Sequence, residues 1–440
     1  MVVIRGFSTM RRNQHNFITH SSSYYPTNTT KVDEYFTTHS LPTPSFNASA
    51  GVPRESPIPA SEPAIQAARQ SVIQDTLELH QLMLGPREHI FSYSPTHLVS
   101  QLAIARFGLA RIVPIDGEAT FAEIAKVTGL GETHVRKLIR HAISQHVFQE
   151  PRPGVVTHSA ASRLLAEDAD LAAWARWCAD DCWLAAYYTC EAMARWPGSE
   201  EPNETGFAVA NQTDLPMFDF LATQPERGAR FAAGMRLYAA RPDLNVQYLV
   251  DAWSSSWGSL PKGATVVDVG GSHGEAAIAL ARAYPSLNLV VQDIDAPTIR
   301  DAYARKPANI SERVRYMTHD FFTEQPIHGA DVYLYRACFH NWSDKYAIRM
   351  LQALIPALKP GARVVLNDVI VPSPKNMPPG SALGVRSGDL SMTMLFNAGD
   401  REMADWARLF EAASSGFHFD DGKQPPGSGL WVLVATWNGV

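Results

Sequence analysis

Three stretches of the chain differ in how hydrophobic and polar residues alternate. Residues 1–60 are rich in Ser, Thr, Asn and Pro and have no apolar period, so we expect a disordered extension there or, as an alternative, a tail that lies over a partner subunit. Across residues 61–252 apolar residues recur at helical spacing, whereas from Ala264 short β-branched runs alternate with helical segments. The pattern therefore predicts an extension (1–60), a mainly helical domain (61–252) and an α/β domain (253–440).

Part of the helical domain has the pattern of a winged helix. Thr120 and Glu123 are spaced as in a capping box at a helix start, and a second helix follows over residues 132–143. Two short extended segments, 147–150 and 155–158, complete the order helix, turn, helix and hairpin. DNA reading is one interpretation, because the second helix carries four basic side chains: Arg136, Lys137, Arg140 and His141. We favour a module for packing or dimerisation, since the second half of the chain has the pattern of an enzyme.

The α/β domain is predicted to be a doubly wound, Rossmann-like sheet. Its candidate strands alternate with helical segments, which is typical of a mainly parallel sheet. They are residues 265–269, 287–293, 330–335, 362–368 and 430–437. Ligands of such sheets bind outside the carboxyl ends of the strands. Residues that follow these strands are therefore the first candidates for function.

A glycine-rich loop follows the first of these strands. Its glycines, Gly270, Gly271 and Gly274, let a ligand approach the backbone closely, but the spacing is not the G-x-G-x-x-G of dinucleotide binders. Asp268, just before the loop, would repel a phosphate and suits a cationic group; the alternative is that it caps the loop structurally. Asp293 ends the next strand, where a carboxylate reaches ribose hydroxyls. An adenosine with a positively charged amino-acid arm satisfies both acids, and S-adenosylmethionine (SAM) is such a ligand.

His340 follows a later strand and is the candidate general base. With an ordinary pKa near 6.5, a histidine can accept the proton of an attacking hydroxyl. Asp368, at the end of the next strand, and Asp400 are expected to orient the ring and stabilise its charged form. The alternative is a histidine with a purely structural role. Ser343 is expected to cap the helix that follows, and the chemistry requires no metal.

Composition and charge narrow the class of protein. The chain has 38 Lys+Arg against 44 Asp+Glu, a net charge of −6, which disfavours nucleic acid as a partner. Four cysteines without a C-x-x-C pair indicate a reducing, cytoplasmic compartment, and no apolar run is long enough to predict a membrane span. The acid-free start, with Arg5, Arg11 and Arg12, leaves a mitochondrial transit peptide as an alternative.

Several ordered motifs together resemble the fungal and plant SAM-dependent O-methyltransferases of the caffeic-acid type. The resemblance runs from about residue 65 to the C-terminus and rests on Arg140-His141-Ala142, His158 to Ser162, Asp268 to Gly274, Asp293, His319 to Phe322, His340 to Asp344, Asp389 to Met392, Asp400-Arg401 and Asp405-Trp406. It implies that Gly270, Gly271 and Asp293 bind SAM. It also implies that Asp320 and Phe321 contact adenine and that His340 is the base. In this family the N-terminal domain forms a homodimer and helps to close the partner's active site.

Three features depart from the family pattern. Asn341 replaces the usual Asp after the base, and Arg336 stands where plant members tend to have Lys. The supporting acids Asp368 and Asp400 are Asp, whereas plant members often have Glu. Some fungal proteins that resemble this family bind SAM without transferring its methyl group, and dehydrate or cyclise polyketide-type substrates. In that alternative His340 and Arg336 would hydrogen-bond a substrate carbonyl; a non-catalytic pathway regulator is a third alternative.

The main expectation is a SAM-dependent O-methyltransferase. It would methylate a hydroxyl of an aromatic or polyketide-derived fungal secondary metabolite, with His340 as the base. A small-molecule substrate and a second copy of the chain are the expected partners, and neither nucleic acid nor a membrane is expected.

Overall fold

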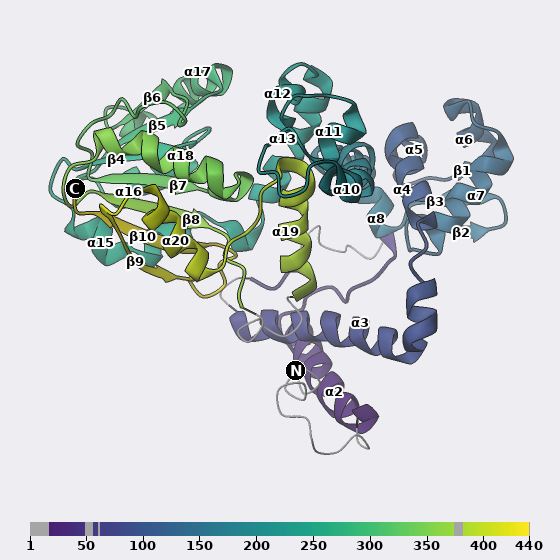
Figure 1. Ribbon diagram of the computed structural model, residues 1–440. Coiled ribbons are helices and arrows are strands. Elements are labelled where there is room, and N and C mark those ends of the chain that lie inside the picture. Colours follow the sequence, from purple (N-terminus) through teal and green to yellow (C-terminus); the bar gives the residue numbers. More distant parts are fainter. Residues whose placement is uncertain (1–16, 49–55, 60–61, 374–381, 440) are drawn as a thin grey trace. The chain divides into compact units, whose positions relative to one another are not determined.

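The computed structural model describes residues 17–48, 56–59, 62–373 and 382–439 (Figure 1). These residues form two compact units, each assembled from several stretches of chain. The helical unit draws on the described parts of Met1–Leu184, Leu221–Tyr238 and Pro378–Leu383, and the sheet unit on those of Ala185–Phe220, Ala239–Met377 and Gly384–Val440. The domain boundaries expected from the sequence, after residues 60 and 252, stay predictions.

Helices α2 (Phe17–Thr38) and α3 (Pro63–Phe91) pack against each other in the helical unit. Helix α2 lies within the segment that was expected to be a disordered extension, although its sequence has no clear apolar period. Phe36, near the end of α2, is buried, so tertiary packing rather than local pattern accounts for the helix. Within α3, Gly85 has a φ of 70° and precedes Pro86, which kinks the helix. The arginines of the transit-peptide alternative lie outside the described residues.

The predicted order of helix, turn, helix and hairpin follows α4 (Thr96–Phe107) and α5 (Leu109–Ile112). Its elements are β1 (Ala119–Thr120), α6 (Phe121–Thr128), α7 (Glu132–Ile143), β2 (Gln149–Arg152) and β3 (Val155–Thr157), with antiparallel strands in the order β1-β3-β2. The capping box is confirmed, since the Thr120 hydroxyl accepts the Glu123 N–H at 3.2 Å and the Glu123 carboxylate accepts the Thr120 N–H at 2.7 Å. Arg140 of α7 pairs with Glu150 at 2.8 Å and lies over the Phe121 ring. This use of Arg140 within the module supports the packing interpretation.

The stretch from residue 160 to residue 259 is mainly helical, as the sequence predicts. It contains α8 (Ala160–Glu167), α9 (Ala169–Trp177), a π-helical turn (Cys178–Cys182), α10 (Trp183–Arg195), α11 (Gly206–Asn211), α12 (Met217–Ala222), α13 (Pro225–Ala239), a 3₁₀ turn (Pro242–Leu244), α14 (Gln247–Ala252) and α15 (Ser254–Ser259). Trp177 and Trp257 are almost completely buried. Part of the aromatic content of this stretch is therefore ordinary core.

The sheet unit is built on seven strands in the order β6-β5-β4-β7-β8-β10-β9 (Figure 1). They are β4 (Thr265–Val269), β5 (Asn288–Asp293), β6 (Val314–Thr318), β7 (Val332–Arg336), β8 (Arg363–Asp368), β9 (Phe417–Lys423) and β10 (Trp431–Trp437). Strands β4 to β8 are parallel, and β9 and β10 are antiparallel, so the predicted Rossmann-like sheet is confirmed. Strands β6 and β9 are not predicted by the sequence pattern, because both are edge strands with several partly or fully exposed positions and no continuous apolar run.

Helices cover both faces of the sheet. The remaining helical elements are α16 (Glu275–Ala283), α17 (Ala296–Arg305), α18 (Asp344–Leu354), α19 (Ala382–Phe396), α20 (Met403–Ala413) and short 3₁₀ turns at Ala308–Ile310, Phe339–Asn341 and Ile355–Ala357. Neighbouring residues of β4 point to opposite faces: Val266 shares a buried cluster with Leu280 of α16, and Val267 shares another with Leu351 of α18. Because both faces are covered, the carboxyl edge of the sheet is the place for a ligand.

Candidate cofactor and active site

Four of the predicted site residues lie at one edge of the sheet. Strands β5, β4, β7 and β8 are adjacent and parallel, so their carboxyl ends meet there. Asp293 ends β5, Gly270 follows β4, Arg336 ends β7 and Asp368 ends β8. The fold thus brings together groups that the sequence analysis placed after separate strands.

The loop after β4 has no room for a side chain at two of its glycines. A Cβ at Gly271 would lie 2.7 Å from Cγ of Asp268, and one at Gly274 would lie 2.9 Å from Cγ2 of Val291. Gly274 also has a φ of +81°, which strains other residues. The glycines therefore keep this loop close against the sheet and leave bare backbone for a ligand.

Asp268 is buried and uses one of its two carboxylate oxygens. Oδ2 accepts a hydrogen bond from the Ala277 N–H of α16 at 3.2 Å, whereas Oδ1 is buried without a partner among the described residues. Burial raises the pKa of Asp268 to about 6. Oδ2 thus has the structural role that the sequence left open, while Oδ1 remains for a cationic ligand group.

Arg336 places a positive charge near Asp268. Its Nη2 donates to the Leu244 carbonyl, and its Nε is buried without a partner in the described part of the chain. Burial lowers the pKa of Arg336, while the negative charges of Glu275, Asp268 and Asp368 favour its charged form. A cation with a spare donor and a carboxylate with a spare acceptor are the groups needed to hold the two charged ends of an α-amino acid.

Asp293 joins two loops at the end of β5. Its Oδ2 accepts the Ser272 N–H at 2.9 Å, and its Oδ1 accepts the Asp295 N–H at 3.0 Å. A carboxylate oxygen has more than one acceptor site. Asp293 is therefore fixed in place and can still accept hydrogen bonds from ribose hydroxyls.

Phe321 belongs to an aromatic cluster beside the glycine loop. It packs edge-to-face on Phe322 and Trp342, with ring centroids 4.9 and 5.8 Å apart. A Cβ at Gly270 would lie 3.8 Å from the Phe321 ring, and Asp320 accepts the Phe322 N–H at 2.9 Å. An aromatic ring next to bare glycine backbone suits a flat base such as adenine.

His340 and Asp368 form a direct pair. The distance from Nδ1 of His340 to Oδ1 of Asp368 is 2.5 Å, and the two side chains are 19% and 1% exposed. Oδ2 of Asp368 accepts the backbone N–H groups of Phe339 at 2.9 Å and of His340 at 3.4 Å. The carboxylate therefore fixes both the ring and the turn that carries it, and Nε2 of His340 has no partner among the described residues.

The charges around His340 favour the protonated ring. Burial by itself lowers the pKa of His340, but Asp368, through its charge and its hydrogen bond, and Asp400 raise it above the ordinary value. Burial tends to raise the pKa of Asp368, yet His340 and the Val369 N–H lower it overall. Burial raises the pKa of Asp400 to about 6. Both acids predicted to act on His340 thus raise its pKa.

Arg401 is a residue of the site that the sequence analysis did not single out, although it stands in the Asp400-Arg401 motif. It is 5% exposed, and its guanidinium donates to the carbonyls of Phe339 at 3.1 Å and Trp342 at 2.7 Å. Its Nε also bonds Asp344 at 2.8 Å. Arg401 therefore holds the backbone on both sides of His340.

The expected cap at Ser343 is wrong. Ser343 occupies the N-cap position of α18, but its hydroxyl makes no capping bond and donates to the Glu200 carbonyl at 2.9 Å. The Glu200 carboxylate instead accepts the Lys345 N–H at 3.0 Å. A residue far away in the sequence replaces the local cap, and local sequence reasoning cannot find such a contact.

Within residues 17–48, 56–59, 62–373 and 382–439, no cluster of three or more His, Cys, Asp or Glu side chains is placed to hold a metal ion. No helix in these ranges is long and apolar enough to cross a membrane.

Comparison with known proteins assigns the family. Residues 200–418 match an O-methyltransferase domain. The chain is 38% identical over 416 residues to the grayanic acid biosynthesis cluster O-methyltransferase of Cladonia grayi, across 93% of this chain and 86% of that protein. It is also 38% identical over 420 residues to O-methyltransferase pyvH of Aspergillus violaceofuscus, across 94% and 96%. The chain belongs to the O-methyltransferase family.

Solved structures share the fold of this O-methyltransferase. OxaC in complex with SAH and oxaline aligns with a TM-score of 0.72 at 21% identity, across 95% of this chain and 100% of that one. LepI in complex with SAM aligns with a TM-score of 0.68 at 21% identity, across 94% and 99%. The predicted family, its methyltransferase fold and its cofactor SAM are confirmed.

Proposed function

We propose that this O-methyltransferase methylates a hydroxyl of an aromatic or polyketide-derived metabolite, with His340 as the general base. The observation that carries the proposal is the 2.5 Å pair of His340 and Asp368, which follows the strands next to the glycine loop. The O-methyltransferase of Cladonia grayi supports this substrate class, since it is named for grayanic acid biosynthesis.

The residues at the sheet edge fit SAM. Asp268 with its unpartnered Oδ1 would hold the ammonium, and Arg336 with its unpartnered Nε would face the carboxylate of the amino-acid arm. Asp293 would bind the ribose hydroxyls, and Phe321 with Asp320 would contact the adenine. Bound SAM supplies a methyl group on a positively charged sulfur.

His340 supplies the proton chemistry. Its Nδ1–H is donated to Asp368, so Nε2 is the atom that accepts the proton of the substrate hydroxyl as the oxygen attacks. Asp368 then stabilises the resulting imidazolium, and Asp400 adds a second negative charge nearby. Such a base contributes roughly 10²- to 10⁴-fold to the rate.

A pericyclase or dehydratase that keeps SAM intact is the second candidate. It is favoured by the fold shared with the protein described as a pericyclic reaction enzyme, at a TM-score of 0.67 and 23% identity across 84% of this chain and 95% of that one. In this alternative the charged Arg336 and protonated His340 would polarise a substrate carbonyl. The raised pKa of His340 supports this role as well.

We also propose that the chain is a cytoplasmic homodimer that associates through the helical unit. Helix α3 exposes large apolar side chains that a second copy would cover: Ile73, Leu77, Leu79, Leu82, Met83, Ile90 and Phe91. A DNA-binding role has less support, because Arg140 is already paired with Glu150. Sedimentation at several protein concentrations tests the dimer.

Incubation with SAM carrying a trideuterated methyl group separates the two candidate reactions. A panel of phenolic polyketides is added, and substrate, product and S-adenosylhomocysteine are measured by mass spectrometry. We expect one labelled methyl group in the product for each S-adenosylhomocysteine formed. If a substrate is cyclised or dehydrated while SAM is not consumed, the pericyclase alternative replaces the methyltransferase.

A further inference from the structure

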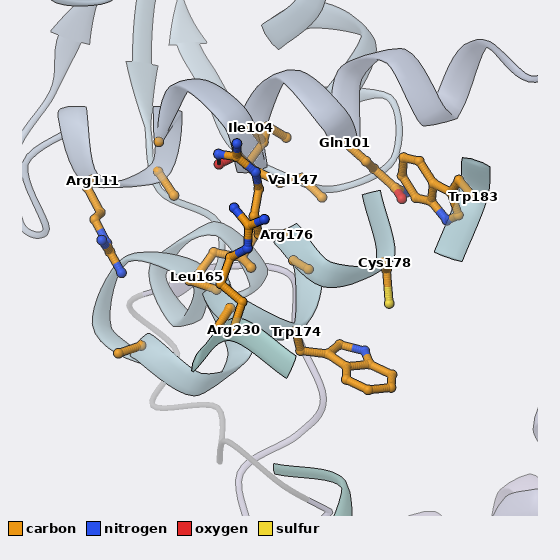
Figure 2. Close-up of a pocket in the computed structure, with 17 residues that line it drawn as sticks. Gln101, Ile104, Arg111, Val147, Leu165, Trp174, Arg176, Cys178, Trp183 and Arg230 are labelled. Atoms are coloured by element: carbon orange, nitrogen blue, oxygen red, sulfur yellow. Dashed lines mark hydrogen bonds between the residues drawn. The ribbon is translucent and has the colours of Figure 1, made fainter. Parts of the chain in front are cut away.

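The helical unit contains a cavity of about 680 Å³ that belongs to no part of the site described above. Its walls come from α4, α5, α8, α9, the π-helical turn, the start of α10 and α13 (Figure 2). The volume lies in the range of ligand pockets, roughly 300–1,000 Å³. A cavity of this size is large enough for a fused aromatic or polyketide-sized molecule.

Most of the wall is apolar. It combines small residues of α9, which leave space, with larger aliphatic and aromatic side chains. The small residues include Ala172 and Ala173, and the larger ones are Ile104, Val147, Leu165, Trp174 and Trp183. An aromatic or aliphatic ligand would gain binding free energy from contact with these walls, because burial of apolar area contributes about 25 cal/mol per Å².

Three guanidinium groups interrupt this apolar wall. Figure 2 shows Arg176 and Arg230 close together at the centre of the cavity, and Arg111 on one side. Arg230 makes no hydrogen bond to the described residues, since its only ion-pair contact, to Asp180, is 3.7 Å long and its Nε is buried without a partner. Arg111 is exposed, and its guanidinium forms neither a hydrogen bond nor an ion pair within the described chain.

The acids nearby do not balance these charges. Asp180 is shared by Arg176, by Arg106 at 2.7 Å and by Arg230 at 3.7 Å. Asp181, the next acid, pairs with Arg227 of α13 and also attracts Arg230. Two carboxylates thus serve four guanidinium groups, so the cavity keeps a positive excess, to which Arg111 adds. An anion in the cavity would offset that excess.

A π-helical turn produces this arrangement. Residues Cys178–Cys182 form five residues of π-helix between α9 and α10, and such turns occur often at functional sites. The turn directs Asp180 to the arginines beside the cavity and Asp181 to α13, and Cys178 lines the cavity wall. A continuous α-helix is the usual structure for such a stretch. The π-helical turn therefore indicates that the placement of Asp180 and Asp181 matters at the cavity.

We propose that this cavity binds an amphipathic organic anion, namely the carboxylate of an aromatic or polyketide-type acid. The carboxylate would lie between Arg111 and Arg230, and the ring system would lie along Ala173, Leu165 and Trp174. This is a second ligand site on the chain, since none of the residues that form the SAM and His340 sites lines it.

Calorimetry with a matched pair of probes tests the charge requirement. The full-length protein is titrated with 2-naphthoate and with the neutral 2-naphthamide. We expect naphthoate to bind and naphthamide to bind about tenfold more weakly or not at all, because a charge-assisted pair is lost. Equal affinities for the two probes would overturn the proposal, because the apolar wall alone would then explain the binding.

Variants locate the site. Arg111→Gln removes a guanidinium that has no partner in the described chain, so the variant should fold and bind naphthoate about tenfold more weakly. Ala173→Trp fills the cavity and should abolish binding. Arg152→Gln is the matched control, because Arg152 pairs with Glu118 and does not line the cavity. Melting temperature and SAM affinity are measured for each variant.

Two results contradict the proposed site. Naphthoate binding that survives both Arg111→Gln and Ala173→Trp would place the probe elsewhere. If naphthoate does not bind the wild type and Ala173→Trp converts a dimer to a monomer, the cavity receives a second copy of the chain rather than a small anion.

Discussion

Two histidines, His158 in the helical unit and His340 in the sheet unit, differ in their hydrogen-bond partners and therefore in their expected roles. His158 is 4% exposed, with Nδ1 3.0 Å from the Ser162 hydroxyl and Nε2 3.0 Å from the Val113 carbonyl. His340 has one nitrogen on the Asp368 carboxylate at 2.5 Å and the other without a partner among the described residues.

The difference in partners reverses the effect of burial. Burial lowers the pKa of His158, and its neutral partners do not restore it, which favours the uncharged ring. Both ring nitrogens have partners. Burial also acts on His340, but the charge of Asp368 outweighs it and raises the pKa. A buried histidine is therefore a catalytic candidate only where a carboxylate supports it and one nitrogen remains for the substrate.

Replacement of each histidine by alanine should give opposite phenotypes and the largest effects. His340→Ala should lower kcat by about 10²- to 10⁴-fold, because the base is lost, while SAM affinity stays near the wild-type value. His158→Ala should leave kcat per folded molecule nearly unchanged. Its free energy of unfolding should fall by about 1–3 kcal/mol, since Val113 and Ser162 lose a buried partner. Methyl-transfer kinetics, calorimetry with SAM and denaturant titration measure these effects.

Either of two results would contradict the different roles assigned to His158 and His340. Full methyl transfer by His340→Ala would remove the assignment of the base. A His158→Ala protein that is as stable as the wild type but inactive would give His158 a role in catalysis.

Asp368→Asn should show what the carboxylate adds to His340. We expect kcat to fall by roughly 10²-fold or more, since an amide does not stabilise the imidazolium. Because loss of the charge lowers the pKa of His340, the acidic limb of kcat/KM against pH should move to lower pH. The matched control is Asp331→Asn. The Asp331 carboxylate accepts the Thr265 N–H at 2.8 Å and lies away from the carboxyl edge of the sheet. An unshifted limb in Asp368→Asn would show that a different group controls it.

The sequence predicted much of this site because its residues follow strands. Asp293, Arg336, Asp368 and the glycine loop each end or follow a β-branched or apolar run, and a parallel sheet places such positions at one edge. The edge strands β6 and β9 lacked that signal. Asp400 and Arg401 reach His340 and its turn through tertiary contacts; Asp400 was expected from its position as an acid, whereas the role of Arg401 had no signal in the sequence pattern.

The hydrophobic and polar pattern of the sequence does not predict contacts between distant segments. The contact of Glu200 with the start of α18 joins positions about 145 residues apart. The helix α2 likewise depends on packing against α3, since its own sequence is polar. In both cases the residue types are compatible with many partners, and only the folded chain selects one.

Asp268 offers a smaller test, on the cofactor side of the sheet unit. Asp268→Asn should weaken SAM binding by about tenfold, or 1.4 kcal/mol. The pKa of Asp268 is raised to about 6 in the free protein, and the ionised form attracts the ammonium. SAM affinity should therefore fall as the pH drops below about 6 in the wild type, and this pH dependence should be weaker in Asp268→Asn. The control Asp420→Asn removes an exposed acid of the edge strand β9, which accepts the Thr436 hydroxyl at 2.6 Å; an equal loss in that variant would argue against a specific contact.

Arg401 should give the smallest effect on catalysis, because it acts through the turn that carries His340. Arg401→Lys keeps a charge but loses the planar fork that bonds the carbonyls of Phe339 and Trp342 together. We expect Arg401→Lys to lower kcat by about three- to tenfold, with KM and the pH limb set by His340 unchanged, since the base remains and only its placement loosens. Arg401→Met should lower kcat further than Arg401→Lys, and Arg408→Met, at an exposed arginine of the same helix region paired with Asp405, should not. A different result would contradict this role: Arg401→Lys and Arg401→Met reduce stability equally while kcat per folded molecule is unaltered. Arg401 would then stabilise the fold of the sheet unit, as His158 stabilises the helical unit, and would not position His340.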